Sequence, residues 1–463
     1  MTHPCDLSAV DAGRQIKEGS LSVSALLESC ITRIEARNPE VNAVVTTCYD
    51  TARQQAAEMD KARPTLPELP PLFGLPVLIK DLIETKGLTT TYGSLHYKDY
   101  IPEFDAAVIK RLRDAGAIIL GKTNTPEFGA GANTFNKVFG ATRNPHNTAL
   151  TSGGSSGGSA VAVACGMAPL AIGSDFGGSL RIPASFCGIV GMRPTPGRVP
   201  CVDMAIGHSP LWTEGPMARS VADAALCMAA IEGYASGDPR AAPLSTPTTH
   251  SPVALGDLKV GVSADLGLAT VETGIRDTFD TLMSTLMSEF AQTQTIDPDL
   301  SAAPEIFKTI RVMDVYARAH ALADIDRDKL GDNVRHNLAL AETLTFAQTA
   351  KASAAHTAIF KAFQKLFDTH DILICPSTAV SPFPVEAPFP SEINGKAVED
   401  YVAWYAVTWA LSLMGCPIVS VPAGRDHKGM PFGIQVIAPR HQDALALNAA
   451  AAIETALRQL GVT

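Results

Sequence analysis

The sequence lacks several patterns by which whole classes of protein are recognised. Its nine cysteines are scattered and include no Cys-x-x-Cys pair, so neither a disulfide framework nor a zinc site is indicated. There is no His-Glu-x-x-His and no Ser-x-x-Lys motif, which removes the usual signatures of metalloproteases and penicillin-binding enzymes. We therefore expect no metal and no cofactor, and a reducing compartment.

Runs of positive charge and long apolar runs are also missing. The net charge is −10 at pH 7 and no Lys/Arg run is present, which argues against nucleic acid or an anionic membrane as a partner. The longest apolar stretch, 160–172, is interrupted by Gly166 and Pro169 and is too short to cross a bilayer. The opening residues M-T-H-P-C-D-L lack the basic and apolar regions of a signal peptide, so the expected location is cytoplasmic.

What the chain does contain is an alternation of strand-length apolar runs with amphipathic helical stretches. This alternation predicts an α/β protein whose sheet is covered by helices on both faces. Helices are predicted at 23–37, 106–115 behind an Asp105 cap, 221–231 and 444–460. The predicted strands are 43–46, 76–79, 117–120, 169–172, 189–192, 259–262, 372–375, 418–421 and 433–437.

The domain organisation follows from the linkers that are absent. No low-complexity segment divides the chain, so we expect residues 1–463 to form a single domain. Residues 303–369 read as almost continuous helix with few strand signals. This segment is predicted to be a helical insertion that covers one edge of the core and helps to shape a pocket.

Two motif matches fail on their context. The segment G-A-I-I-L-G-K-T (116–123) satisfies the Walker A pattern, but its variable residues are those of a buried strand, whereas a phosphate-binding loop needs flexible residues. The segment G-G-S-S-G (153–157) fits a nucleophile elbow, yet a polar, Pro-broken segment precedes it where a buried strand is required. Nucleotide binding and a Ser-His-Asp hydrolase are therefore disfavoured.

The most informative stretch lies between Ser152 and Ser179, where two Gly-Gly-Ser clusters flank an apolar segment. Each cluster predicts a tight turn with an exposed hydroxyl, that of Ser155 or of Ser179. Upstream, Lys80 ends the apolar run 75–79, where desolvation favours the neutral, proton-accepting form of a lysine. Taken one at a time, such a lysine is more often a surface residue and such a turn only a turn; the combination is what is informative.

In this order the segments resemble the amidase signature family. The resemblance extends over nearly the whole chain and includes 105–128, 186–199, 214–223, 392–401, 415–424 and 432–439. Small departures occur: Met192-Arg193 stand where Leu-Lys is commoner. The motifs that carry the resemblance are G-L-P-V-L-I-K-D (74–81), G-G-S-S-G-G-S (153–159) and G-S-D-F-G-G-S-L-R-I-P-A (173–184).

The resemblance implies a fold and a mechanism. The fold is the amidase signature fold, a mixed central β-sheet covered by helices on both faces, with a catalytic core at about 70–225 and the helical insertion over the active-site side. The mechanism is a Ser-cisSer-Lys triad in which Ser179 is the nucleophile, Ser155 relays the proton across a cis 154–155 peptide and Lys80 is the general base.

The resemblance also assigns supporting residues. The backbone N–H groups of an oxyanion hole are expected from Phe176, Gly177 and Gly178. Asp175 and Arg181 flank the nucleophile and have a structural interpretation as well as a functional one. The residues expected to contact substrate are Phe128, Gly129, Ser156 and Asp175.

The function implied is amide hydrolysis through an acyl-enzyme, with esters and carbamates left open. Aromatic and apolar residues near the expected pocket favour apolar or aryl amides: Phe128, Phe176, the stretch 306–316, Tyr401, Trp404, Tyr405 and Trp409. The alternative is the glutamine-hydrolysing component of a tRNA-dependent amidotransferase. Against it, residues 206–216 read I-G-H-S-P-L-W-T-E-G-P rather than the S-S-L-D-Q-I-G-P type of segment. The expected partners are a small amide and water, with a homodimer left open.

Overall fold

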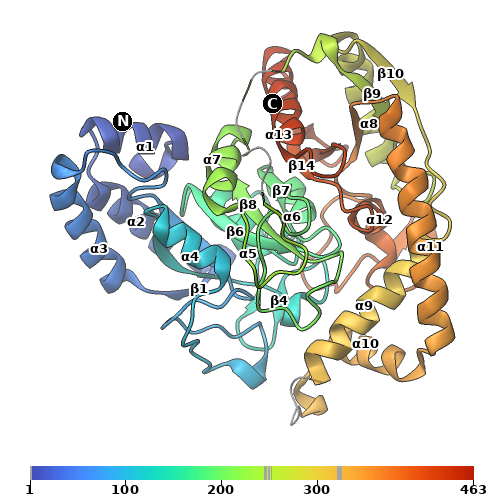
Figure 1. Cartoon of the computed structure of the whole chain (residues 1–463), viewed down its shortest axis with the longest axis horizontal. Helices are drawn as coiled ribbons and strands as arrows, with labels where there is room; N and C mark the ends of the chain where they lie inside the picture. The colour runs from blue at the N-terminus through green and yellow to red at the C-terminus, as the bar shows by residue number, and fades with distance from the viewer. Residues whose placement is uncertain (1–2, 244–247, 249–250, 252, 321–325) are drawn as a thin grey trace.

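A mixed sheet of 11 strands runs through the molecule (Figure 1). The computed structural model describes residues 3–463 except 244–247, 249–250, 252 and 321–325. The strands of this sheet are β1 (Val44–Thr47), β2 (Pro76–Lys80), β3 (Ile118–Thr123), β6 (Leu170–Asp175), β7 (Val190–Arg193), β8 (Thr213–Ala218), β9 (Lys259–Val262), β10 (Gln292–Thr295), β11 (Ile372–Pro376), β14 (Ile418–Arg425) and β15 (Pro431–Ile437).

The strand order is β1-β3-β2-β6-β8-β7-β14-β15-β11-β9-β10. β2 is parallel to both β3 and β6, and β9 is parallel to β10 and β11, while the central pairs from β6 to β15 are antiparallel. Every residue of β2, β3, β6 and β8 is buried, as expected for strands covered on both faces. Two short hairpins lie apart from this sheet: β4 (Phe135–Asn136) with β5 (Gly140–Ala141), and β12 (Glu392–Ile393) with β13 (Lys396–Ala397).

Helices cover the sheet on both faces (Figure 1). One layer holds α5 (Gly157–Ala164) and α6 (Arg181–Cys187), which contact each other and the central strands. The other layer holds α4 (Ala107–Asp114), α7 (Val221–Ile231) and α13 (Asp443–Gln459). Further helices are α1 (Ala9–Glu18), α2 (Val23–Val41) and α3 (Tyr49–Ala62) near the N-terminus, then α8 (Thr273–Leu286) and α12 (Ala406–Ser412).

The predicted helical insertion is present. It consists of α9 (Ala303–His320), α10 (Asp332–Thr343) and α11 (Phe346–Gln364), which Figure 1 shows in orange tones along one side of the molecule. α9 packs against α10, α11 and α12. Residues 321–325 of the predicted insertion lie outside the described residues.

The predicted strands are all found, with ends displaced by up to a few residues, and the remaining strands were missed for physical reasons. β8 has the sequence T-E-G-P-M-A, which contains no apolar run although all of it is buried. β10 is Q-T-Q-T at the edge of the sheet, where a polar strand is tolerated. The predicted Asp105 cap was wrong: Ala106 is the N-cap of α4, and Asp105 instead accepts the Lys86 N–H and pairs with Arg113.

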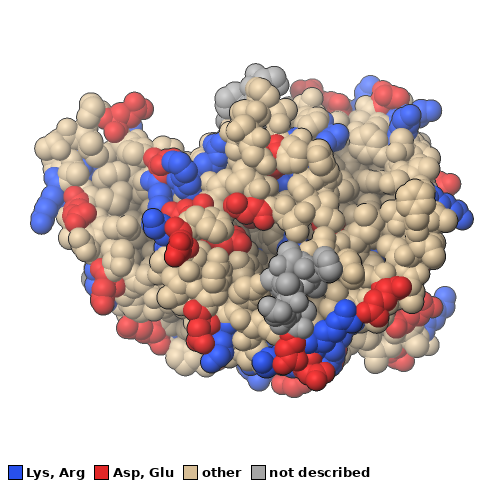
Figure 2. All heavy atoms as spheres, turned by 60° about the horizontal axis from the view of Figure 1, so that its bottom comes forward, with Lys and Arg blue, Asp and Glu red and all other residues tan. Residues whose placement is uncertain are grey.

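The surface has no feature that points to a polyanion or a bilayer. On the face shown in Figure 2, Lys and Arg are interspersed with Asp and Glu, and the described atoms form no broad basic surface there. No helix among the described residues combines the length and the apolar character needed to cross a membrane.

Candidate active site

Lys80 ends β2 in a pocket of hydroxyl groups. Its side chain is fully buried, and Nζ lies 2.6 Å from Ser155 Oγ, 2.9 Å from Ser156 Oγ and 3.0 Å from Ser174 Oγ. No carboxylate of the described residues forms an ion pair with it. Burial lowers the pKa of Lys80 well below its usual range. The amine is therefore held in its neutral, proton-accepting form.

The strand order explains why these hydroxyls meet the lysine. β2 and β6 are parallel neighbours, so their C-terminal ends lie at the same edge and bring Lys80 beside Ser174. The peptide between Gly154 and Ser155 is cis, and Ser156 is the N-cap residue of α5. Ser156 Oγ also donates to the Ser174 carbonyl at 3.1 Å. The loop before α5 is thus tied to the end of β6.

Ser179 lies in the turn between β6 and α6, with its carbonyl accepting the Ser156 N–H at 3.2 Å. This bond joins the two Gly-Gly-Ser turns that the sequence singled out. A Cβ at Gly178, where φ is +133°, would lie 2.4 Å from Thr408 Oγ1, so the tight turn requires glycine there. Within the described structure no hydrogen bond joins the hydroxyls of Ser155 and Ser179; such catalytic contacts often close only with substrate bound.

The geometry corrects one member of the expected oxyanion hole. The Gly178 N–H donates to Asp175 Oδ1 at 2.9 Å and is therefore already satisfied. The backbone N–H groups of Phe176, Gly177 and Ser179 make no hydrogen bond to any described residue. Three amides around the nucleophile are thus available, but the set differs from the predicted one by one residue.

Asp175 is the centre of a buried ion network behind the nucleophile. It is fully buried and pairs with Arg181 Nη2 and Arg193 Nη1, each at 3.0 Å, and accepts the Leu180 N–H at 3.1 Å. Although burial raises its pKa, Arg181 and Arg193 hold the pKa of Asp175 well below its usual range. Arg193, the departure noted in the sequence, supplies one of these charges. An ionised Asp175 fixes the amides on either side of Ser179.

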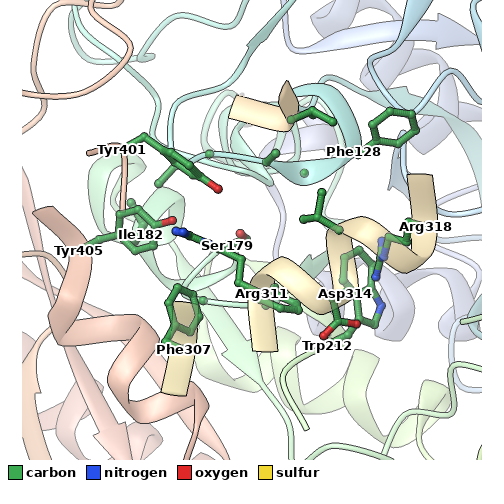
Figure 3. Close-up of a pocket in the computed structure, with 18 residues that line it drawn as sticks. Phe128, Ser179, Ile182, Trp212, Phe307, Arg311, Asp314, Arg318, Tyr401 and Tyr405 are labelled. Atoms are coloured by element: carbon green, nitrogen blue, oxygen red, sulfur yellow. The ribbon is translucent and has the colours of Figure 1, made fainter. Parts of the chain in front are cut away.

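A cavity of about 810 Å³, open to solvent, adjoins Ser179 (Figure 3). Of the residues expected to contact substrate, Phe128 and Gly129 line it, whereas Ser156 and Asp175 do not. A Cβ at Gly129 would lie 3.4 Å from Ser155 Oγ, which shows how closely the wall approaches the triad. The lining residues are Phe128 to Ala132, Phe176, Gly177, Ser179, Ile182, Trp212, Phe307, Arg311, Asp314, Val315, Arg318, Val334, Tyr401 and Tyr405.

The wall combines aromatic rings from the insertion and from the segment before α12. Phe307 of α9 stacks on Trp409 with ring centroids 4.8 Å apart and lies 6.0 Å from the Phe176 ring. Trp409 thus supports the wall from behind, and Trp404, also expected near the pocket, packs on Phe186 instead. The predicted insertion and aromatic segment do form the cavity, but only some of their rings face it.

Charged residues of the cavity were missed by sequence reasoning. Arg311, Asp314 and Arg318 lie on the inner side of α9, where their spacing of three to four residues matches the apolar face that was expected. A second cavity shares Phe128, Trp212 and Arg318 with the first. Its acidic lining residues are Glu84, Asp203 and Glu214.

Comparison with known proteins identifies the family. The model of the Amidase family matches residues 25–447. The chain belongs to this family. It is 33% identical over 454 residues to the acylamidase of Rhodococcus erythropolis (97% of this chain, 95% of that one) and 35% identical over 482 residues to the A component of the glutamyl-tRNA(Gln) amidotransferase of Koribacter versatilis (strain Ellin345; 97% and 98%). It superposes on a bacterial aryl acylamidase of the amidase signature family with a TM-score of 0.92 at 29% identity (97% and 96% covered).

Membership confirms the expected amidase signature fold and makes the protein an amide-hydrolysing enzyme. Of the amidase's site, the motifs located Lys80, Ser155 and Ser179. They did not indicate Ser174, which lies inside an apolar strand and becomes a partner of Lys80 only through the pairing of β2 with β6. Among the residues described, no group of three or more His, Cys, Asp and Glu side chains is placed to hold a metal ion.

Proposed function

We propose that Ser179 attacks the amide carbon, that Ser155 carries its proton and that Lys80 is the base. The observation that supports this most is the buried Lys80 amine 2.6 Å from Ser155 Oγ, with hydroxyls and no carboxylate around it in the described structure. A serine hydroxyl is a weak nucleophile until a base takes its proton. A lysine can accept that proton only when burial keeps it neutral, and Lys80 meets this condition.

The proposed reaction has two stages. Ser179 Oγ forms a bond to the amide carbon while its proton passes through Ser155 to Lys80. The carbon–nitrogen bond then breaks, and the amine leaves with a proton returned through Ser155. Water attacks the resulting ester on Ser179 by the same proton route and releases the carboxylic acid, which regenerates the free hydroxyl.

The negative oxygen of the tetrahedral intermediate is proposed to lie against the free amides of Phe176, Gly177 and Ser179. Donors that already point at this oxygen stabilise it without reorganisation. The Gly178 N–H is directed to Asp175 instead, so Gly178 contributes the shape of the turn.

We propose an apolar or aryl amide as substrate. The cavity wall presents Phe128, Phe307, Tyr401 and Tyr405, and an acyl or aryl group in contact with them gains about 25 cal/mol for each Å² of apolar surface removed from water. The solved relative with a TM-score of 0.92 is an aryl acylamidase, which agrees with this proposal. Esters and carbamates of similar shape fit the same chemistry.

The alternative is cleavage of glutamine in a tRNA-dependent amidotransferase, favoured by the 35% identity to the A component of such an enzyme. The segment 206–216, which departs from the type expected of that component, places Trp212 in the cavity wall. An indole there favours a substrate with an aromatic or apolar group over the small polar glutamine side chain. We therefore place glutamine hydrolysis second.

Initial rates with an aryl or longer-chain amide, acetamide and glutamine test this proposal. The aryl or long-chain amide is expected to show the highest kcat/KM, and Ser179→Ala is expected to lose turnover and labelling by a sulfonyl fluoride. A preference for glutamine or acetamide would overturn the substrate class, and capture of the acyl group on Ser155 would overturn the assignment of the nucleophile.

A cytoplasmic setting is proposed on the state of the cysteines. All nine are free thiols, and eight are buried. Free thiols persist where the compartment is reducing. Location of a tagged enzyme by cell fractionation tests this expectation.

A further inference from the structure

The cavity beside Ser179 contains a buried arginine without a counter-ion. Arg311 of α9 is 4% exposed, and its Nε and Nη1 atoms have no hydrogen-bond partner. None of the ion pairs between described residues includes it. A guanidinium remains charged at any physiological pH, and a buried charge that is neither paired nor hydrogen-bonded is unfavourable. An anion brought into the cavity would satisfy these donors.

The other charges of the cavity are already engaged with protein groups. Asp314 accepts the Ser209 hydroxyl at 2.7 Å, and the cations that act on its carboxylate are Arg318 and Arg240. The Arg318 guanidinium lies over the Trp212 ring, 4.2 Å from its centroid. Asp314 is therefore not the missing partner of Arg311, although both lie on α9.

Aromatic rings hold the Arg311 guanidinium near the nucleophile. Its Cζ atom lies 5.3 Å from the Tyr401 centroid and 5.8 Å from the Phe307 centroid. Figure 3 shows the side chain extending from α9 toward the side of the cavity that holds Ser179, Tyr401 and Tyr405. Contact with the ring faces offsets part of the desolvation of the cation and leaves N–H donors at its edge unused.

We propose that the substrate is an amide that also carries a carboxylate, and that Arg311 binds this carboxylate while Ser179 attacks the amide carbon. The inference rests on the proposed hydrolysis at Ser179 and narrows its substrate class. Carboxylate is the matching anion because a guanidinium can donate two parallel N–H···O bonds to it. The rings of Phe307 and Tyr401 contact the apolar part that joins the carboxylate to the amide.

Matched pairs of amides test this. One pair places the charge on the acyl group: succinyl p-nitroanilide against 4-methylpentanoyl p-nitroanilide, in which an isopropyl group replaces the carboxylate. The second pair places it on the amine: 4-acetamidobenzoate against 4-isopropylacetanilide. We expect the carboxylate to raise kcat/KM by about 10- to 100-fold in at least one pair, as a charged hydrogen-bonded contact does.

Variants assign the effect to one residue. Arg311→Gln is expected to remove the ratio of kcat/KM between charged and neutral amide, and Arg311→Lys to keep part of it, because a point charge remains without the two-pronged geometry. Arg318→Gln is the matched control, since it removes an equal charge from the same cavity. Its effect on the ratio is expected to be much smaller than that of Arg311→Gln.

The outcomes separate this inference from the amidase mechanism. Hydrolysis of neutral and charged amides at equal kcat/KM in both pairs, or an unchanged ratio in Arg311→Gln, would overturn the role of Arg311 and leave Ser179 as nucleophile. Titration calorimetry with benzoate gives a measurement that needs no turnover. Benzoate is expected to bind the wild type at least about 10-fold more tightly than Arg311→Gln, and equal binding would overturn the inference even if no test amide is hydrolysed.

Discussion

Two fully buried lysines stand on neighbouring strands of the sheet and have different surroundings. Lys80 ends β2 and contacts the hydroxyls of Ser155, Ser156 and Ser174. Lys122 lies on β3, where its Nζ is 4.0 Å from the Asp81 carboxylate and also contacts the Ile83 carbonyl and a threonine hydroxyl. Burial and residue type are the same, so the difference lies in the partners.

The partners determine the charge of each lysine. Burial lowers the pKa of Lys80 well below its usual range, but that of Lys122 only to about 8, because Asp81 opposes the effect of burial. Burial raises the pKa of Asp81 to about 6. At neutral pH, Lys122 and Asp81 form an ion pair and Lys80 is uncharged. A hydroxyl cage thus makes a base, and a carboxylate makes a structural cation.

The largest effect is expected for Lys80→Met. Loss of the base that activates the nucleophile is expected to lower kcat/KM for an aryl amide by at least about 10⁴-fold. The melting temperature is expected to stay the same or rise, because Met fills similar volume without an amine to desolvate. A variant with a near-normal rate would contradict the role of Lys80, and single-turnover assays with thermal unfolding measure both quantities.

Lys122→Met is expected to have the opposite profile. It leaves the Asp81 carboxylate buried without its cation and should lower the free energy of unfolding by about 3–5 kcal/mol. Urea unfolding followed by tryptophan fluorescence measures this loss.

The double variant Asp81→Asn/Lys122→Met is the control for that interpretation. It removes both charges together and should recover part of the lost stability. If Lys122→Met alone is as stable as the wild type, Lys122 is not a structural cation.

The pH profile is a third way to separate the two lysines. Lys80 accepts a proton only when neutral, so kcat/KM should rise as pH rises through its lowered pKa and level off above it. The midpoint should lie below the usual lysine value of 10.5. A rate that keeps rising through 10.5 would mean that Lys80 is not desolvated in the working enzyme.

The smallest effect is expected for Ser174→Ala. It removes one of three hydroxyls around Lys80 Nζ and leaves the proton route through Ser155 in place. Loss of about 1 kcal/mol of hydrogen bonding corresponds to a fall in kcat of about 5- to 10-fold. A fall as large as that of Lys80→Met would show that Ser174 itself carries the proton.

The contrast between the lysines also shows how far the sequence could be interpreted. Lys80 was predicted as a desolvated base because it ends an apolar run, and Ser155 and Ser179 followed from their glycine-rich turns. Lys122 ends a similar run in the rejected Walker A match, yet nothing local distinguishes the two. Their difference arises where the chain brings Asp81 and Ser174 beside them, and contacts between strands are not encoded in local spacing.

The substrate cavity was predicted only in outline for the same reason. The insertion and the segment 401–409 were expected to form it, and both do. The interpretation of 306–316 as apolar missed Arg311 and Asp314, because on a helix of mixed character the inward face depends on what α9 packs against. The oxyanion hole was off by Gly178, whose amide is directed by a carboxylate on the same turn.

The Asp175 network makes catalysis dependent on the far end of the chain. Arg181, which pairs with Asp175, donates to the Thr408 carbonyl, the Ser412 hydroxyl and Gln435 Oε1. These acceptors are synthesised more than 220 residues after Arg181, as the sequence separations of 227, 231 and 254 show. A nascent or truncated chain that ends before them carries all three triad residues but not the support for the nucleophile's turn. Amidase activity is therefore a signal of completed synthesis and folding, and the unfinished polypeptide does not act as a hydrolase.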